Sequence, residues 1–468
     1  MSSRPATLGQ LKESGWQSVP VKEEVRRNAI RRIASGAPIV ERVLGYDETV
    51  LPQLENALVA GHDIIFLGER GQAKTRIIRS LTNLLDEWIP IVAGSEILDD
   101  PYRPVSRYAR DLIGHEGDDT QISWVHRHDR FGEKLATPDT SIADLIGEVD
   151  PIKVAEGRYL ADELTLHYGL VPRTNRGIFA INELPDLAER IQVGLLNVLE
   201  ERDIQVRGYK IRLPLDVMLV ASANPEDYTN RGRIITPLKD RFGAQIRTHY
   251  PLDVETEIEV MRQESVLAEA DGLRVAVPEY MSEIVATLSQ LARQSPHINQ
   301  RSGVSVRLSV ANNETMVASS IRRALRLGET EAVPRISDLD SLAASTSGKV
   351  EIETIDEHRD GHVVERLIQQ SVLTVFKSAV PTEHLRAATA DFDGGDVLHT
   401  GDDIPSGDFV SALGKFPTLR ELVGSVPGAR GESAGEVASA TEFVLEGLHL
   451  AKRLNKDAAG TRATYRAR

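Results

Sequence analysis

The sequence predicts an α/β fold in which a parallel β-sheet is flanked by helices. Three short apolar runs, at Asp63–Leu67, Gly177–Ile181 and Val217–Ala223, have the length and the continuous hydrophobicity of strands that are buried on both faces. Helical patterns precede the first run, at Leu51–Ala60, and separate the later two, at Asp186–Glu201. In sheets of this kind the ligand binds at the carboxyl ends of the strands, so the residues that follow each run are the first candidates for function.

The composition is that of an ordinary globular protein. The chain has 468 residues, of which 41% are hydrophobic and 27% are charged, and this length predicts roughly two to four domains. Changes in pattern divide it into an N-terminal extension (1–36), an α/β domain (37–250), a helical domain (251–345) and a mostly helical C-terminal segment (346–468). The absence of cysteine excludes disulfides, cysteine-ligated zinc and thiol catalysis.

Charge and hydropathy restrict the partners. The net charge of −15 repels nucleic-acid backbones, and aromatic residues are too few, at 5%, to favour a stacking surface for single strands, so nucleic acid is an unlikely partner. The N-terminus lacks the apolar core of a signal peptide, and no run approaches the length of a membrane span. We therefore expect a soluble, cytoplasmic protein without membrane insertion.

The two ends of the chain contain no recognisable functional motif, and only their secondary structure can be predicted. An amphipathic stretch occupies Val21–Ile33, and the last segment predicts helices near Val363–Phe376 and Ala440–Leu454 with a Gly/Asp-rich loop between them, at Asp391–Gly407. The C-terminal tail is rich in basic residues, and we expect it to be solvated or frayed. These residues are Lys452, Arg453, Lys456, Arg462, Arg466 and Arg468.

A P-loop pattern follows the first apolar run. Its glycines allow backbone N–H groups to surround a phosphate, and the helix that begins there adds positive dipole character. Lys74 would reach the β- and γ-phosphates of ATP, and the Thr75 hydroxyl would bind Mg²⁺. Ala73 stands where glycine usually precedes the lysine, a mild change if this position has helical φ and ψ. The pattern comprises Gly68, Glu69, Arg70, Gly71, Gln72, Ala73, Lys74 and Thr75.

The second run ends in Asn182 and Glu183, in the manner of a Walker B element. Such an element delivers an acid to the Mg²⁺ shell and a glutamate that polarises the attacking water. Glu183 fits the second role. Asn182 stands where aspartate is usual and offers an oxygen without a charge, so weaker Mg²⁺ binding or slower hydrolysis is expected.

Two more polar residues continue this series. The third run ends at Asn224, whose amide would orient the attacking water beside Glu183. Arg241 follows a helical turn, and an arginine supplied by a neighbouring subunit can stabilise the charge on a transferring phosphoryl group.

Taken together, these motifs resemble the AAA+ ATPases of the magnesium-chelatase ATPase-subunit and MoxR type. The resemblance rests on GERGQAKT, IFAINE, LLNVLEERDIQVRG, VASANPED and LKDRFG, and it covers roughly residues 37 to 345. It implies a P-loop AAA+ domain followed by an α-helical lid. Within that domain it implies a helix-2 insert at Asp144–Gly157 and a pre-sensor hairpin in which two short strands, at Ile204–Val206 and Ile211–Leu213, flank Gly208.

The resemblance also implies functional roles. Lys74 and Thr75 correspond to Walker A, Asn182 and Glu183 to Walker B, and Asn224 to sensor 1. Arg241 corresponds to the arginine finger, and Arg307 is the best candidate for sensor 2, with Arg301 as the fallback.

The implied cofactors are ATP and Mg²⁺. The implied assembly is a ring, most often a hexamer, which acts on a protein with a von Willebrand factor A domain or within a metal-insertion complex. The function expected on this basis is an ATP-hydrolysing machine that remodels or activates a partner protein.

Two other functions stay open. Asn182 and Ala73 are compatible with a nucleotide-gated scaffold that hydrolyses little ATP, and related inserts occur in DNA-dependent motors. An activator of the alternative sigma factor is disfavoured, because the Gly-Ala-Phe-Thr-Gly-Ala loop is absent.

Three further patterns are interpreted as structural. Gly431–Gly435 matches a nucleophile elbow but follows no strand, so we interpret it as a flexible linker. The acids from Asp391 to Asp396 lack the glycine and the closing glutamate of a calcium loop, and His126–Asp129 lacks a third ligand at metal-binding spacing.

Overall fold

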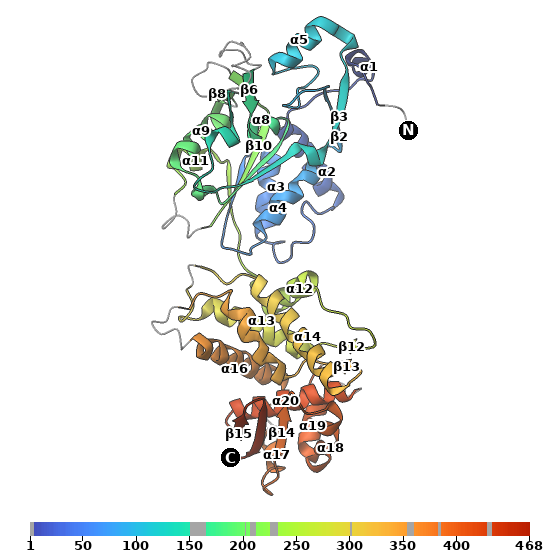
Figure 1. Ribbon diagram of the computed structural model, residues 1–468, viewed down its shortest axis with the longest axis vertical. Coiled ribbons are helices and arrows are strands. Elements are labelled where there is room, and N and C mark those ends of the chain that lie inside the picture. The colour runs from blue at the N-terminus through green and yellow to red at the C-terminus, as the bar shows by residue number, and fades with distance from the viewer. Residues whose placement is uncertain are drawn as a thin grey trace. The chain divides into compact units, whose positions relative to one another are not determined.

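The computed structural model divides into two compact units, Met1–His249 and Tyr250–Arg468 (Figure 1). Each unit is described by itself. The structure describes residues 4–149, 165–201, 203–205, 212–224, 233–299, 302–352, 360–381, 385–427 and 433–468.

Unit 1 is built on a five-stranded sheet with the order β11-β1-β10-β7-β4, in which every pair of neighbours is parallel. The three apolar runs form its three central strands, so the predicted fold class is confirmed. The edge strands β4 and β11 have mostly half-buried or exposed side chains and lack a continuous apolar run, which is why the sequence did not reveal them. The strands are β1 (Ile64–Leu67), β4 (Phe131–Leu135), β7 (Gly177–Asn182), β10 (Val217–Ala223) and β11 (Ala244–Arg247).

Helices cover both faces of this sheet. Alternate strand residues point to opposite faces, so Ile64 and Phe66 pack into one apolar cluster while Ile65 and Leu67 pack into the other. The first face is covered by α2 (Val21–Ser35), α3 (Val50–Ala60) and α4 (Lys74–Ser80), and the second by α9 (Glu189–Glu201) and α11 (Thr236–Arg241) (Figure 1). The amphipathic stretch near the N-terminus is thus α2, which belongs to the core of unit 1.

Shorter elements complete unit 1. Strands β8 and β9 pair antiparallel with Ile204 opposite Leu213, as the predicted hairpin requires, and Gly208 lies outside the described residues. The predicted insert begins with α6 and β5, and its residues 150–157 also lie outside them. These elements are α1 (Leu8–Glu13), η1 (Leu81–Leu84), β2 (Trp88–Val92), α5 (Arg107–Glu116), η2 (Gly117–Asp119), β3 (Ile122–His126), η3 (Arg127–Arg130), α6 (Ile142–Leu145), β5 (Gly147–Val149), β6 (Leu166–Tyr168), α8 (Leu170–Arg173), η5 (Leu184–Asp186), β8 (Asp203–Gln205) and β9 (Arg212–Pro214).

Unit 2 is mainly helical. One large apolar cluster extends from Ile258 to Tyr465, so it contains residues on both sides of position 345. The elements of unit 2 are α12 (Val254–Glu264), β12 (Arg274–Val275), α13 (Glu279–Gln294), α14 (Arg307–Leu327), β13 (Glu331–Ala332), η6 (Ile336–Ser341), α15 (Leu342–Ser347), α16 (Asp360–Ala379), α17 (Leu385–Ala390), β14 (Leu398–Gly401), α18 (Ser406–Ala412), η9 (Leu413–Lys415), α19 (Pro417–Ser425), α20 (Ala434–Leu450), β15 (Leu454–Ala459) and β16 (Arg462–Ala467).

The prediction of a frayed C-terminal tail is wrong. The tail forms the hairpin β15–β16, and β16 also pairs with β14, which lies within the predicted Gly/Asp-rich loop. Tyr465 is 2% exposed and its hydroxyl donates to Glu446 of α20. The basic residues of β16 occupy exposed positions that alternate with its buried positions, and they obscured the strand pattern in the sequence. The last helix also begins earlier than predicted, at Ala434, where the Ser433 hydroxyl accepts from the Glu436 N–H.

A buried ion pair joins α2 to η3, the 3-10 helix that leads into the edge strand β4. The two terminal guanidinium nitrogens of Arg130 donate to the two carboxylate oxygens of Glu24, at 2.8 and 2.6 Å, and both side chains are nearly inaccessible to solvent. Arg130 immediately precedes β4 and also donates to the Arg176 carbonyl oxygen. Bidentate geometry of this kind holds two elements in a fixed relation, and removing one partner leaves the other charge buried without compensation.

We predict that Glu24→Ala lowers the free energy of unfolding of unit 1 by about 3–5 kcal/mol. Glu23→Ala, which removes the exposed pair with Arg26 one position earlier, is expected to cost about 1 kcal/mol or less. Urea unfolding followed by tryptophan fluorescence measures both, because all three tryptophans, Trp16, Trp88 and Trp124, lie in unit 1. Equal losses in the two variants would contradict this account.

Candidate nucleotide site

The P-loop lies between β1 and α4 and has two residues in the left-handed region of backbone space. Gly71 has φ 75°, which glycine adopts without strain. Ala73 has φ 55° and ψ 11°, so this position does not have the helical conformation under which the alanine would be a mild change. A left-handed conformation costs a non-glycine residue about 1–2 kcal/mol.

Contacts from distant segments fix the shape of the loop. A Cβ atom on Gly68 would lie 1.9 Å from Thr248 Oγ1, so any other residue there would displace the Thr248 side chain. Thr248 Oγ1 donates to Gln72 Oε1 at 2.7 Å, and the Tyr46 hydroxyl lies 2.9 Å from the Gln72 carbonyl oxygen. Burial raises the pKa of Tyr46, which keeps the phenol protonated as a donor. These supports could not be predicted from the sequence, because neither Thr248 nor Tyr46 belongs to a motif.

Lys74 is buried at the start of α4, and its ammonium group donates to oxygens of the P-loop and of the strand end beside it. Its Nζ donates to the carbonyl oxygens of Gly68 and Glu69, at 2.5 and 2.7 Å, and to Asn224 Oδ1 at 2.7 Å. Anionic phosphate oxygens are stronger acceptors for an ammonium group than these neutral oxygens are.

Asn224 connects Lys74 to Glu183. Its Nδ2 donates to Glu183 Oε2 at 2.8 Å, while its Oδ1 accepts from the lysine. Glu183 has φ 55° and ψ 49°, a left-handed conformation that is rare for glutamate and occurs mainly where function requires it. The structure therefore brings together three of the residues that the sequence placed at the ends of separate elements.

Asn182 makes a second chain of hydrogen bonds at the same edge of the sheet. Its Nδ2 donates to Glu133 Oε1 at 2.5 Å, and its Oδ1 accepts from Ser222 Oγ at 3.1 Å. Arg79 of α4 donates to Glu133 Oε2 at 2.8 Å, and this contact raises the pKa of Arg79. The sequence did not indicate Glu133, because it lies in the polar edge strand β4 without any motif around it.

The oxygen atoms at this edge suit a hard divalent cation. Thr75 is the second residue of α4, the helix whose Arg79 contacts Glu133. Its hydroxyl, the amide oxygen of Asn182 and the carboxylates of Glu133 and Glu183 are the oxygen ligands that the elements at this edge carry. Mg²⁺ prefers oxygen ligands of these types and retains several waters. The residues present therefore fit ATP with Mg²⁺.

The predicted arginines lie on the surface of the two units. Arg241 is the last residue of α11 in unit 1, and Arg307 is the first residue of α14 in unit 2, and both are exposed. Arg301 lies outside the described residues.

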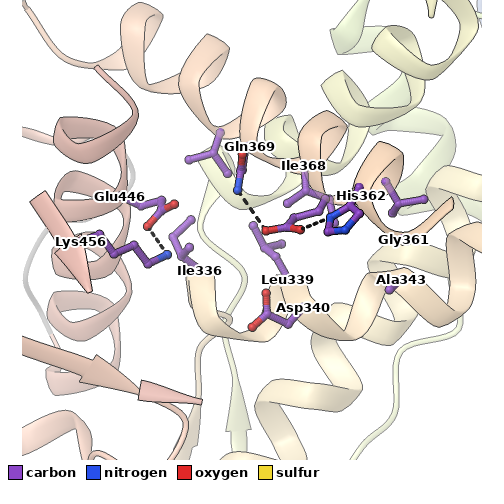
Figure 2. A pocket seen from close by; sticks show the side chains of 13 residues that line it. Ile336, Leu339, Asp340, Ala343, Gly361, His362, Ile368, Gln369, Glu446 and Lys456 are labelled. Carbon is purple, nitrogen blue, oxygen red and sulfur yellow. Dashed lines mark hydrogen bonds and ion pairs between the residues drawn. The ribbon is translucent and has the colours of Figure 1, made fainter. Parts of the chain in front are cut away.

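Unit 2 contains a separate pocket of about 410 Å³ (Figure 2). Apolar residues of η6 and α16 form much of its lining, and Glu446 and Lys456 form an ion pair of 2.7 Å at one side. Gln369 and His362 both approach Glu365. None of the residues predicted from the motifs lines this pocket, so it is distinct from the candidate nucleotide site.

Neither a metal-binding cluster nor a membrane span emerges from the part of the chain that the structure describes. There, no group of three or more His, Cys, Asp or Glu side chains is arranged to hold a metal ion. Across the same residues, every helix is too short or too polar to cross a bilayer.

Comparisons with known proteins point to one family. The model of the Sigma-54 interaction domain matches residues 156–241, which include Glu183, Asn224 and Arg241. The magnesium-chelatase 38 kDa subunit of Rhodobacter capsulatus is 29% identical over 234 residues, which are 47% of this chain and 59% of that protein. Magnesium-chelatase subunit ChlI of Nostoc sp. is 28% identical over 231 residues, 48% and 57% of the two chains. These similarities support an AAA+ ATPase of the magnesium-chelatase type.

The chain spans less than two thirds of the length of either of these relatives. Among solved structures, one of the complex between subunits BchI and BchD of magnesium chelatase is 22% identical to it, with a TM-score of 0.35. That match covers 71% of this chain and 98% of the other.

The strain at Ala73 leads to a test of the P-loop conformation. We predict that Ala73→Gly raises the free energy of unfolding of unit 1 by about 0.5–1 kcal/mol, because relief of the left-handed strain exceeds the added freedom of the unfolded chain. Ala34→Gly, at an exposed helical position of α2, is expected to lower it by a similar amount. The same urea experiment compares them, and a loss in both variants would show that Ala73 is unstrained.

Proposed function

We propose that this chain binds ATP with Mg²⁺ at the carboxyl edge of the sheet in unit 1 and hydrolyses the nucleotide. The observation that carries this proposal is the continuous chain of contacts from Lys74 through Asn224 to Glu183. It connects the side chain that would hold the phosphates to the carboxylate that would polarise the attacking water. A change at one end can therefore reach the other through a single amide.

Each residue has a distinct task in this proposal. The backbone N–H groups of Gly68–Thr75 and the Lys74 ammonium group bind the phosphates, and Thr75 and Asn182 provide oxygens for Mg²⁺. When bound, MgATP supplies the phosphoryl group and part of the charge neutralisation for its transfer. Glu183 accepts a proton from the attacking water, and Asn224 positions that carboxylate.

The two arginines act on the transferring phosphate from outside the P-loop. Arg241 is proposed to reach the site of a neighbouring copy, and Arg307 to act as sensor 2, with Arg301 as the alternative. Arg307 begins α14, whose first turn has no acidic residue. A helix N-terminus favours an anion, so an arginine there gains most when a phosphate lies close to it.

The proposed assembly is a cytoplasmic ring of identical copies, most often a hexamer. Hydrolysis would drive the lid and the insert, and so remodel or activate a partner protein. A protein with a von Willebrand factor A domain, or a metal-insertion complex, is the proposed partner. The support for this part is the motif series and the similarity to magnesium-chelatase subunits.

A nucleotide-gated scaffold is the second candidate. It is favoured by Asn182, which lacks the charge of aspartate, and by the strained alanine at position 73. In that case the chain would bind ATP tightly and assemble, but it would turn over little nucleotide. A DNA-dependent motor has no comparable support.

ATP turnover of the full chain with Mg²⁺ tests the proposal, at concentrations where copies associate. We expect the parent to hydrolyse ATP, Lys74→Ala to be inactive, and Lys12→Ala, which removes an exposed lysine of an ion pair, to match the parent. Activity that appears only in Asn182→Asp would contradict hydrolysis and favour the scaffold. Stimulation of the parent by added DNA would favour the motor instead.

A further inference from the structure

Asn182 leaves the proposed magnesium site without the negative charge that an aspartate would supply. We propose that Glu133, on the neighbouring strand, supplies that charge and positions Asn182 in the Mg²⁺ shell. This inference rests on the proposed function. It assigns a task to a residue that lies in none of the nucleotide-binding motifs.

Strand register places Glu133 on the correct face of the sheet. Strand β4 runs parallel to β7 with Leu135 opposite Asn182 and Glu133 opposite Ala180, so Glu133 and Asn182 point to the same side. That side is covered by α4, because Arg79 of this helix contacts Glu133. The same helix begins with Lys74 and Thr75, the residues that would hold the phosphates and the metal.

The hydrogen bond between the two side chains is well defined. An ionised carboxylate only accepts, so the Nδ2 of Asn182 must face Glu133 and its Oδ1 must face away. The Oδ1 accepts from Ser222 Oγ, which in turn accepts from the Glu183 N–H. An amide oxygen has two lone pairs, and one is left for a metal or a metal-bound water. Glu133 thus fixes the direction of the oxygen that Asn182 offers.

Asn182 and Glu133 together carry one negative charge, as a single aspartate does. Mg²⁺ usually retains several waters, so a carboxylate next to its direct ligand can act through one of them. Asn182 is 8% exposed, so its contact with Glu133 is screened from solvent on the Asn182 side.

If Glu133 had a purely structural role, it would act only through its ion pair with Arg79. The Arg79 side chain is 64% exposed, and ion pairs with such exposed groups contribute about 1 kcal/mol or less to stability. If Glu133 acts only through this ion pair, Arg79→Gln should have the same effect as Glu133→Gln. If Glu133 acts on the metal site, Arg79→Gln should not reproduce that effect.

The test measures how much Mg²⁺ the full chain needs for tight binding of a fluorescent ATP analogue. We expect Glu133→Gln to raise the half-saturating Mg²⁺ concentration by about 10–100-fold, the usual effect of losing an outer partner of a metal ligand. Affinity for the analogue in a chelator should not change. Arg79→Gln is the matched control and should retain the Mg²⁺ requirement of the parent.

The double variant Glu133→Gln with Asn182→Asp returns one carboxylate to the pair, and we expect it to regain most of the Mg²⁺ affinity. The inference is overturned if Glu133→Gln behaves like the parent, if Arg79→Gln reproduces its defect, or if the double variant regains nothing. A parent that binds the analogue without any dependence on Mg²⁺ would overturn this inference while nucleotide binding stands. A parent that does not bind the analogue at all would overturn the proposed function as well.

Discussion

The parallel register of four strands is the constraint on which the candidate site depends. Because β1, β10, β7 and β4 all run in one direction, their carboxyl ends meet at one edge, and the side chains that follow them are brought within hydrogen-bond distance. A slip of one residue between β7 and β4 would move Glu133 to the opposite face from Asn182. The continuous apolar packing on both faces of β7 makes such a slip costly.

Two of the six non-glycine residues that have positive φ in the described part of the chain lie at the same edge. Ala73 and Glu183 both have positive φ, and each lies immediately beside a residue proposed to bind the nucleotide or the metal. Strain of this kind persists only where surrounding contacts over-determine the conformation. Thr248 and Tyr46 provide such contacts for the P-loop, and Ser222 and Asn224 provide them for Glu183. These contacts hold a local geometry that the chain would not adopt alone.

The central strands and the family could be predicted from the sequence because their signals are local. β1, β7 and β10 are continuous apolar runs that end in recognisable motifs. The edge strand β4 could not be predicted in this way, and Glu133 became visible only through its contact with Asn182. The conformation of Ala73 could not be predicted from the sequence either, since it is imposed by contacts from residues far along the chain. In unit 2, basic residues on the exposed face of β16 hid a strand whose other face is buried.

Calorimetric titration of the full chain with a non-hydrolysable ATP analogue and Mg²⁺ tests the central claim most directly. The account predicts one site per chain in the parent. It predicts that Lys74→Ala weakens binding by roughly 10–150-fold, the value of a hydrogen-bonded charge of about 1.5–3 kcal/mol. Equal affinity in the two proteins would contradict the account, because the P-loop lysine would then have no part in nucleotide binding.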